Sequence, residues 1–258
     1  YANFYNSVYE KNDVTPPAAY SDYVRKQYYD GDWREGTDWQ REILQDNYKQ
    51  NYYVNVSHGN EKSNYSLSAN FYDEEGLHIN YGTTRYNLRA SSDFKIGKYF
   101  KVGESLSATR RINRYSRTAW YLSIWASPLM NIHNPDNKEG FEGPQVDFEY
   151  VTAEGDTTSV KNTGGNDKEN PVGYVSIPDN EWTSDNLIAD VYVEFEPIEG
   201  LTLRSSPSIN AYFYDTHEWE KAYDLGVRSN PSASLRHRTE RGQTIAIKNK
   251  IDFNKTFG

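Results

Sequence analysis

The sequence predicts an all-β fold, an antiparallel segment of a transmembrane β-barrel, and three observations support this. Apolar and polar residues alternate through seven segments, the connections between segments are alternately short and long, and aromatic residues bracket the apolar middles of the clearest segments. Because successive side chains of a strand point to opposite faces, such alternation gives each strand one apolar and one polar face. About 9–11 residues are enough for a tilted strand to cross a bilayer.

The alternation locates the strands. In the first segment, Tyr52, Val54 and Val56 fall on one face, with polar or amphipathic residues between them. Glu104 is an exception, because strict alternation directs it toward lipid; a bulge or a position near the bilayer interface would accommodate it. Seven strands are predicted, at about residues 51–58, 64–72, 85–94, 99–109, 187–196, 201–214 and 244–253.

The connections alternate in length, with short ones at 58–64, 95–99 and 196–200 and longer ones at 73–84, 110–186 and 215–243. Outer-membrane barrels have tight periplasmic turns and extended extracellular loops, whereas a soluble sandwich has no reason to place every long loop at one end. We therefore expect residues 1–49 to be an extracellular lead-in with two short helices. Residues 50–258 are expected to be a partial barrel with a long external loop at 110–186.

Aromatic residues lie where a membrane would place them. Tyr65 and Phe71 bracket a small apolar middle, and Tyr86 and Phe94 do the same on the next strand. Rings at both ends of a spanning strand form the aromatic girdles at the two bilayer interfaces.

A soluble secreted β-sandwich that binds glycans through exposed aromatic residues is the alternative, because half-buried strands of soluble proteins also alternate. The two folds differ in the surroundings of the apolar face. A barrel places that face against lipid and a sandwich buries it against a second sheet. The residues that separate the two interpretations are Leu67, Leu88, Val191 and Leu203.

Composition excludes several classes. The 258 residues carry a net charge of −9, which argues against a nucleic-acid partner. The chain has no cysteine, which excludes disulfides, thiolate metal sites and a cysteine nucleophile. No apolar run approaches the ~20 residues of a transmembrane helix. A mean hydropathy of −0.92 is compatible with a barrel, because only every second strand residue needs to be apolar.

Aromatic side chains are the best candidates for ligand contact. The chain has 23 tyrosines and six tryptophans, and Trp120, Tyr121 and Trp125 lie together in the long loop, in a stretch that predicts a short helix. Flat rings on an external loop can stack on a sugar or grip a peptide. The alternative is that they pack this helix against the barrel interior, and the sequence does not separate the two.

Six polar residues should face the lumen of the barrel if the predicted alternation is right. There they would form the substrate path or contact a plug, because lumenal side chains tune selectivity in such barrels. These residues are Arg89, Asp93, Tyr192, Glu194, Arg204 and Asn210.

The sequence predicts no enzyme, metal site or cofactor. Its five histidines lie on separate segments without an i, i+4 pair, which is typical of solvated loop histidines. Calcium binding at 136–140 is a minor alternative, because Asp136 and Glu139 lie beside Gly140. The segment lacks the ligand spacing of an EF-hand, and solvated loop charge is the favoured interpretation.

Five pieces of sequence together resemble the SusC/RagA-like branch of TonB-dependent outer-membrane transporters. They extend over most of residues 37–213 in a consistent order. The pieces are Thr37-Asp38-Trp39-Gln40, Glu75-Gly76-Leu77 with Arg85-Tyr86-Asn87-Leu88-Arg89, Lys101-Val102-Gly103-Glu104-Ser105-Leu106, Ser127-Pro128-Leu129-Met130 with Asn134-Pro135-Asp136, and Glu199-Gly200-Leu201-Thr202-Leu203.

The resemblance implies a barrel of about 22 strands with an N-terminal plug in the outer membrane of a Gram-negative bacterium. It also implies import of oligosaccharides or peptides with a SusD-like surface lipoprotein, driven by TonB. The sequence has about a third of those strands and neither plug nor TonB box, so we expect an internal piece of a longer protein. The family function is then a property of the parent polypeptide.

Overall fold

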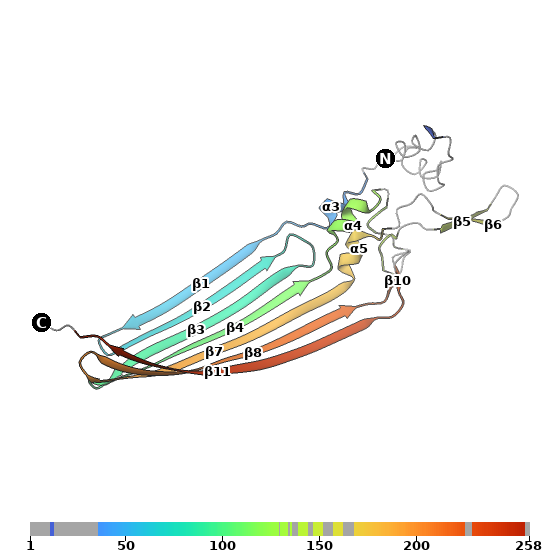
Figure 1. Cartoon of the computed structure of the whole chain (residues 1–258). Coiled ribbons are helices and arrows are strands. Elements are labelled where there is room, and N and C mark those ends of the chain that lie inside the picture. Colours follow the sequence, from blue (N-terminus) through green and yellow to red (C-terminus); the bar gives the residue numbers. More distant parts are fainter. Residues whose placement is uncertain are drawn as a thin grey trace. The chain divides into compact units, whose positions relative to one another are not determined.

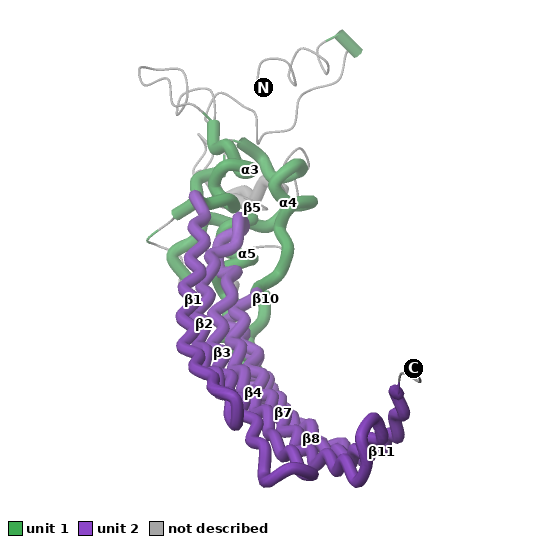
Figure 2. The backbone as a smooth tube through the Cα atoms, turned by 90° about the vertical axis from the view of Figure 1, so that its left-hand side faces the viewer, with its two compact units in different colours: residues 1–45, 116–178, 219–234 green, residues 46–115, 179–218, 235–258 purple. Residues whose placement is uncertain are grey.

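The computed structural model describes residues 11–12, 36–128, 130–133, 135, 139–143, 147–151, 157–161, 168–224 and 229–255. The chain forms two compact units: residues 1–45, 116–178 and 219–234 belong to the first, and residues 46–115, 179–218 and 235–258 to the second (Figure 2). The two short helices predicted before residue 29 lie outside the described residues. The predicted division into a lead-in and a partial barrel stays a prediction.

The second unit is built on one seven-stranded sheet. Its order follows the chain, and the pairs β1–β2, β2–β3, β3–β4 and β4–β7 are antiparallel (Figure 1). The strands are β1 (Lys49–Gly59), β2 (Ser63–Glu75), β3 (Gly82–Ile96), β4 (Phe100–Tyr115), β7 (Pro178–Ile198), β8 (Leu201–Glu220) and β11 (Ser234–Phe253).

The strands run further than predicted. Strand β4 continues to Tyr115 instead of ending at 109, β7 begins at Pro178 instead of 187, and β11 begins at Ser234 instead of 244. The long connection therefore covers 116–177 and not 110–186. The reason is that the apolar alternation stops where a strand leaves the hydrocarbon layer, while the hydrogen-bonded ladder goes on.

The apolar face of the sheet is exposed. Leu67 and Leu88 are each 52% exposed and Val191 is 50% exposed, while Leu203 is half-buried. Among the described residues no second sheet covers this face, which is the outcome that the barrel interpretation predicts. The sandwich alternative would bury these side chains and is not supported.

Glu104 keeps its place on the apolar face. The registers of β3 with β4 and of β4 with β7 are continuous, so no bulge turns this residue away. Directly opposite on β3 is Ser92, whose hydroxyl donates a hydrogen bond to the Glu104 carboxylate. Of the two alternatives offered for Glu104 the bulge is therefore wrong, the position near the interface stays a prediction, and a serine partner compensates the exposed acid.

Tight turns join the strands at the end of the sheet opposite to the long connections. In the first turn the side-chain oxygen of Asn60 accepts hydrogen bonds from the amides of Lys62 and Ser63, at 2.8 and 2.9 Å. Gly97 and Gly200 have positive φ angles of 66° and 84°, which glycine adopts without steric cost. These local signals explain why the short connections were predictable from the sequence.

The first unit contains short helices and two small ladders. The helices are α3 (Trp39–Glu42), α4 (Trp120–Trp125) and α5 (Pro171–Ser176); β5 (Asp147–Val151) pairs with β6 (Thr157–Lys161), and β9 (Tyr223–Asp224) with β10 (Ser229–Asn230). No helix in the described part of the chain is long and apolar enough to cross a bilayer. The buried hydrophobic cluster of this first unit is formed by Trp39, Ala126 and Met130, with Ile132 and Val172 packed against it.

Two of the sequence motifs meet inside this unit. The amide of Thr37 donates to the carbonyl of Pro128 at 2.8 Å, and its hydroxyl donates to that of Met130 at 2.8 Å. The indole Nε1 of Trp39 donates to the carbonyl of Ser127 at 2.8 Å. The Thr37–Gln40 motif therefore supports the segment that follows α4, about 90 residues later in the chain.

Asn170 fixes the start of α5. Its side chain is fully buried, and its Oδ1 accepts a hydrogen bond from the amide of Gly173 at 3.0 Å, as an N-cap does. Its Nδ2 donates to three backbone carbonyls, those of Asn131, Ile132 and Glu142. A single buried amide thus links the start of α5 to the two backbone segments around Ile132 and Glu142.

Candidate substrate-facing surfaces

A groove of about 680 Å³ lies on the sheet, mostly on its polar face, toward the end with the tight turns. Four of the six residues predicted to face the lumen line it, Arg89, Asp93, Tyr192 and Arg204. Glu194 joins them through an ion pair with Arg204 at 3.0 Å. Asn210 lies elsewhere, where its Oδ1 accepts a hydrogen bond from Asn186 at 2.9 Å.

The ring of Tyr192 is the centre of this cluster. Gly103 lies directly opposite in the register, and a Cβ at that position would collide with the ring. The glycine therefore lets Tyr192 lie across the neighbouring strand. The guanidinium of Arg204 is 3.8 Å from the ring centroid, and Nζ of Lys101 is 5.8 Å away, both within cation–π range.

Two ion pairs flank the ring. Lys101 pairs with Asp93 at 3.0 Å, and Arg204 pairs with Glu194 at 3.0 Å. All four side chains are partly exposed, so each pair contributes only about 0–1 kcal/mol to stability. The pairs serve mainly to hold the charged groups around Tyr192 in fixed positions.

Lys101 and Gly103 were absent from the predicted site. Alternation alone places both on the polar face, but their role depends on the register between β4 and β7, which brings Gly103 opposite Tyr192. Strands that are separated by more than 60 residues do not reveal their register in the sequence. The glycine inside an alternating strand was the available signal.

The aromatic candidates of the long loop lie on α4. Trp120, Tyr121 and Trp125 are 45%, 63% and 53% exposed, and the last two rings lie 6.0 Å apart. Leu122 and Ser123 are the buried residues of this helix. The structure thus leaves the three rings open to a ligand, and substrate contact by them stays a prediction.

Arg117 anchors the segment before α4. Its guanidinium pairs with Glu220 at 2.5 Å and lies 5.0 Å from the ring centroid of Tyr174. Burial alone would lower the pKa of Arg117, but hydrogen bonds to Tyr223 and Glu220 outweigh it and raise the pKa. Arg117 therefore keeps its charge at any physiological pH, which fixes this part of the loop unit.

The segment considered for calcium is only partly described. Glu139 forms an ion pair with Lys221 at 2.6 Å, and Asp136 lies outside the described residues. Among described residues, no three His, Asp or Glu side chains are grouped to hold a metal ion. Calcium remains the minor alternative that the sequence offered.

No protein-family model matches the chain. Two proteins of Formosa agariphila are similar to it in sequence: TonB-dependent receptor P3, 24% identical over 98% of this chain, and TonB-dependent receptor P26, 21% identical over 59%. The chain spans 24% and 14% of the lengths of these relatives. This chain is related to TonB-dependent receptors.

Solved structures agree with the relationship at the level of fold. The RagAB peptide importer in its closed-closed state has a TM-score of 0.63 over 92% of this chain and 27% of that chain, at 16% identity. The open-open state of the same importer has a TM-score of 0.61 over 90% of this chain and 26% of that chain, at 17% identity. The SusC/RagA-like resemblance of the motifs is confirmed, and with it the outer membrane of a Gram-negative bacterium as the location.

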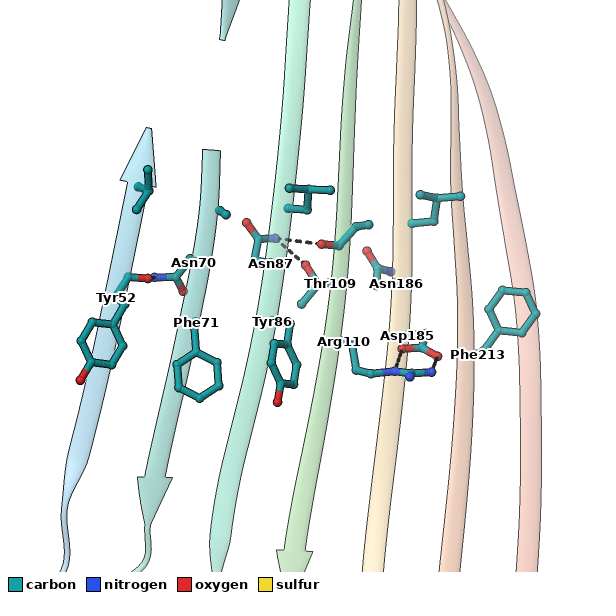
Figure 3. A pocket seen from close by; sticks show the side chains of 15 residues that line it. Tyr52, Asn70, Phe71, Tyr86, Asn87, Thr109, Arg110, Asp185, Asn186 and Phe213 are labelled. Atoms are coloured by element: carbon teal, nitrogen blue, oxygen red, sulfur yellow. Dashed lines mark hydrogen bonds and ion pairs between the residues drawn. The ribbon is translucent and has the colours of Figure 1, made fainter. Parts of the chain in front are cut away.

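In a SusC/RagA-like barrel the apolar face of the sheet lies against lipid, and the polar face is the lumenal face. One row of the apolar face consists of Tyr52, Phe71 and Tyr86, followed in the register by Arg110 and Asp185. Figure 3 shows this row beside a groove of about 760 Å³. The three rings form part of an aromatic girdle.

The height of the apolar band fits a bilayer. On β4 the band runs from Phe100 to Arg110, ten residue-to-residue steps or about 33 Å of strand. A tilt of about 40° reduces this to a height of about 25 Å, which is typical of outer-membrane barrels. Arg110 marks the end of the band, where two hydrogen bonds of 2.7 Å to Asp185 neutralise its charge.

Proposed function

We propose that this chain contributes a wall segment and an external loop unit to a TonB-dependent outer-membrane importer of peptides or oligosaccharides. The protein is a transport component and not an enzyme. A SusD-like surface lipoprotein is the proposed partner at the loops, and TonB supplies the energy through a plug domain. The exposed Trp120, Tyr121 and Trp125 carry the proposal.

Recognition at the loops is passive. The flat rings of α4 offer stacking surface for a sugar or for peptide side chains, and the polar face of the sheet offers ion pairs and hydrogen-bonding groups along the path inward. The RagAB peptide importer has the same fold in this region, which supports import and leaves peptide and oligosaccharide as the two substrate classes.

The test replaces the rings of α4. We expect the Tyr121→Ala, Trp125→Ala double variant to take up labelled peptide or oligosaccharide about tenfold less well at low concentration, because loss of two stacking contacts is worth about 1–2 kcal/mol. Ile124→Ala is the matched control, since Ile124 is 53% exposed on the same helix but has no ring. Uptake is measured in cells that produce the protein, with its surface amount quantified by antibody.

Two results would count against the proposal. Cells that lack the protein would accumulate the same oligomers at the same rate, or the double variant would behave like the Ile124→Ala control at equal surface amount. Uptake that persists after the proton gradient is dissipated would argue against TonB as the source of energy.

A further inference from the structure

The lumenal face carries a group of cations near the end of the sheet with the long connections. Lys49 on β1, Arg85 on β3 and Arg111 on β4 all fall on the polar positions of their strands. Arg110 and Arg114, the neighbours of Arg111 on the same strand, fall on the opposite face. The three lumenal cations are therefore separated by the sheet from Arg110 and Arg114.

The register brings these cations together. Arg85 lies directly opposite Arg111, and on its other side it lies opposite Tyr72 of β2. Like charges directly opposite one another destabilise a sheet, so this pairing calls for a reason. The guanidinium of Arg85 is 5.1 Å from the Tyr72 ring centroid, and Nζ of Lys49 is 5.2 Å from the same centroid.

Hydrogen-bond donors outnumber acceptors at this place. Among the described residues, Nε of Arg85 and Nδ2 of Asn113 are buried without an acceptor. The Oδ1 of Asn113 accepts from the Thr83 hydroxyl at 2.8 Å, and Asn113 follows Arg111 by two positions on the same face. Buried donors in folded proteins normally have a partner, so the described side chains do not complete the hydrogen bonding around Arg85 and Asn113.

Within the described part of the chain, one carboxylate belongs to this group. Glu74 accepts a hydrogen bond from the hydroxyl of Tyr72 and balances one of the three positive charges. Asp185 pairs with Arg110 on the apolar face and is not available. Two of the three positive charges are left for a ligand.

We propose that Lys49, Arg85 and Arg111 form a lumenal binding site for a carboxylate group of the imported oligomer. The inference rests on the proposed function and narrows it to acidic substrates. The planar guanidinium groups match a carboxylate in shape and can bind it with two parallel hydrogen bonds. The carboxylate belongs to an acidic peptide or to an acid sugar.

The experiment compares matched acidic and neutral probes in cells that produce the protein. One pair is a fluorescent octapeptide with four glutamates and its glutamine counterpart. The other is an oligogalacturonate and its methyl ester. We expect the acidic member of one pair to be taken up at least about tenfold faster, and that pair identifies the source of the carboxylate.

The variants separate the site from general charge effects. In the Arg85→Gln, Arg111→Gln variant we expect the acidic-to-neutral ratio to fall to about one while uptake of the neutral probe is unchanged. Arg110→Gln is the matched control, because it removes a cation one residue away on the opposite face and should leave the ratio unchanged. If the double variant does not reach the surface, Arg111→Gln and Arg111→Lys are compared, and only the lysine variant should retain the preference.

The outcomes distinguish the two proposals. Equal uptake of acidic and neutral probes by the unmodified protein overturns the carboxylate site and leaves the proposed import function. The same holds if Arg110→Gln removes the preference as well, or if the lumenal variants retain it. Uptake of none of the four probes overturns the import function itself.

Discussion

At the scale of single residues, the lumenal surface depends on small side chains that make room for large ones. Gly103 accommodates the ring of Tyr192, and Gly242 on β11 does the same for Tyr212 on β8. In both cases the glycine sits inside a strand, where its conformational freedom has a cost. Close packing of a tyrosine across the sheet compensates this cost, and in the first case it also positions the Arg204 guanidinium.

We predict that Gly103→Ala destabilises the protein by about 1–3 kcal/mol, because the new methyl group collides with Tyr192. Urea unfolding of the protein folded in detergent measures the change. Combining the substitution with Tyr192→Ser removes the ring, so the double variant should be more stable than the sum of the single effects predicts. Ser105→Ala, two positions away on the same face, is the control; additive effects of Gly103→Ala and Tyr192→Ser would show that the two residues do not interact.

At the scale of elements, each strand has two environments along its length as well as two faces. Its middle carries the apolar band, and its end toward the long connections carries charge on both faces, as Arg110 and Arg111 of β4 show. This explains why the strands were predicted to be shorter than they are. It also explains why charge is tolerated at Arg110, whereas Glu104, deeper in the band, has the Ser92 hydroxyl as a compensating partner.

We predict that Leu88→Lys destabilises the barrel by about 2–4 kcal/mol, because it places a charge on the lipid-facing side of β3. Ser91→Lys is the control, since Ser91 belongs to the polar face of the same strand. Both variants are folded into vesicles and unfolded in urea. Equal stability losses for the two would contradict the assignment of faces.

At the scale of the whole molecule, the alternation of turns and loops fixes which ends of the strands face outward. Lys98 lies in a tight turn, and Tyr121 lies in the long connection between β4 and β7. Outer-membrane barrels keep tight turns in the periplasm. The chain has no cysteine, so single cysteines introduced into it report their own accessibility.

We predict that Tyr121→Cys reacts with a membrane-impermeant maleimide in intact cells and that Lys98→Cys reacts only after the outer membrane is permeabilised. The labelled band should appear in the outer-membrane fraction. Labelling of Lys98→Cys in intact cells would show that the tight turns face outward and that the proposed orientation is wrong.

The existence of the seven strands, their two faces and the alternation of turns and loops could be predicted from the sequence, because these follow from local transfer free energies and from turn residues such as Asn60 and Gly200. The full length of the strands and the residues that meet across them could not. The pairing of Gly103 with Tyr192, of Arg85 with Arg111, and of Trp39 with Ser127 depends on register and packing between segments far apart in the chain. Such contacts arise from hydrogen-bonded ladders and a shared core, and neither leaves a periodic signal in the sequence.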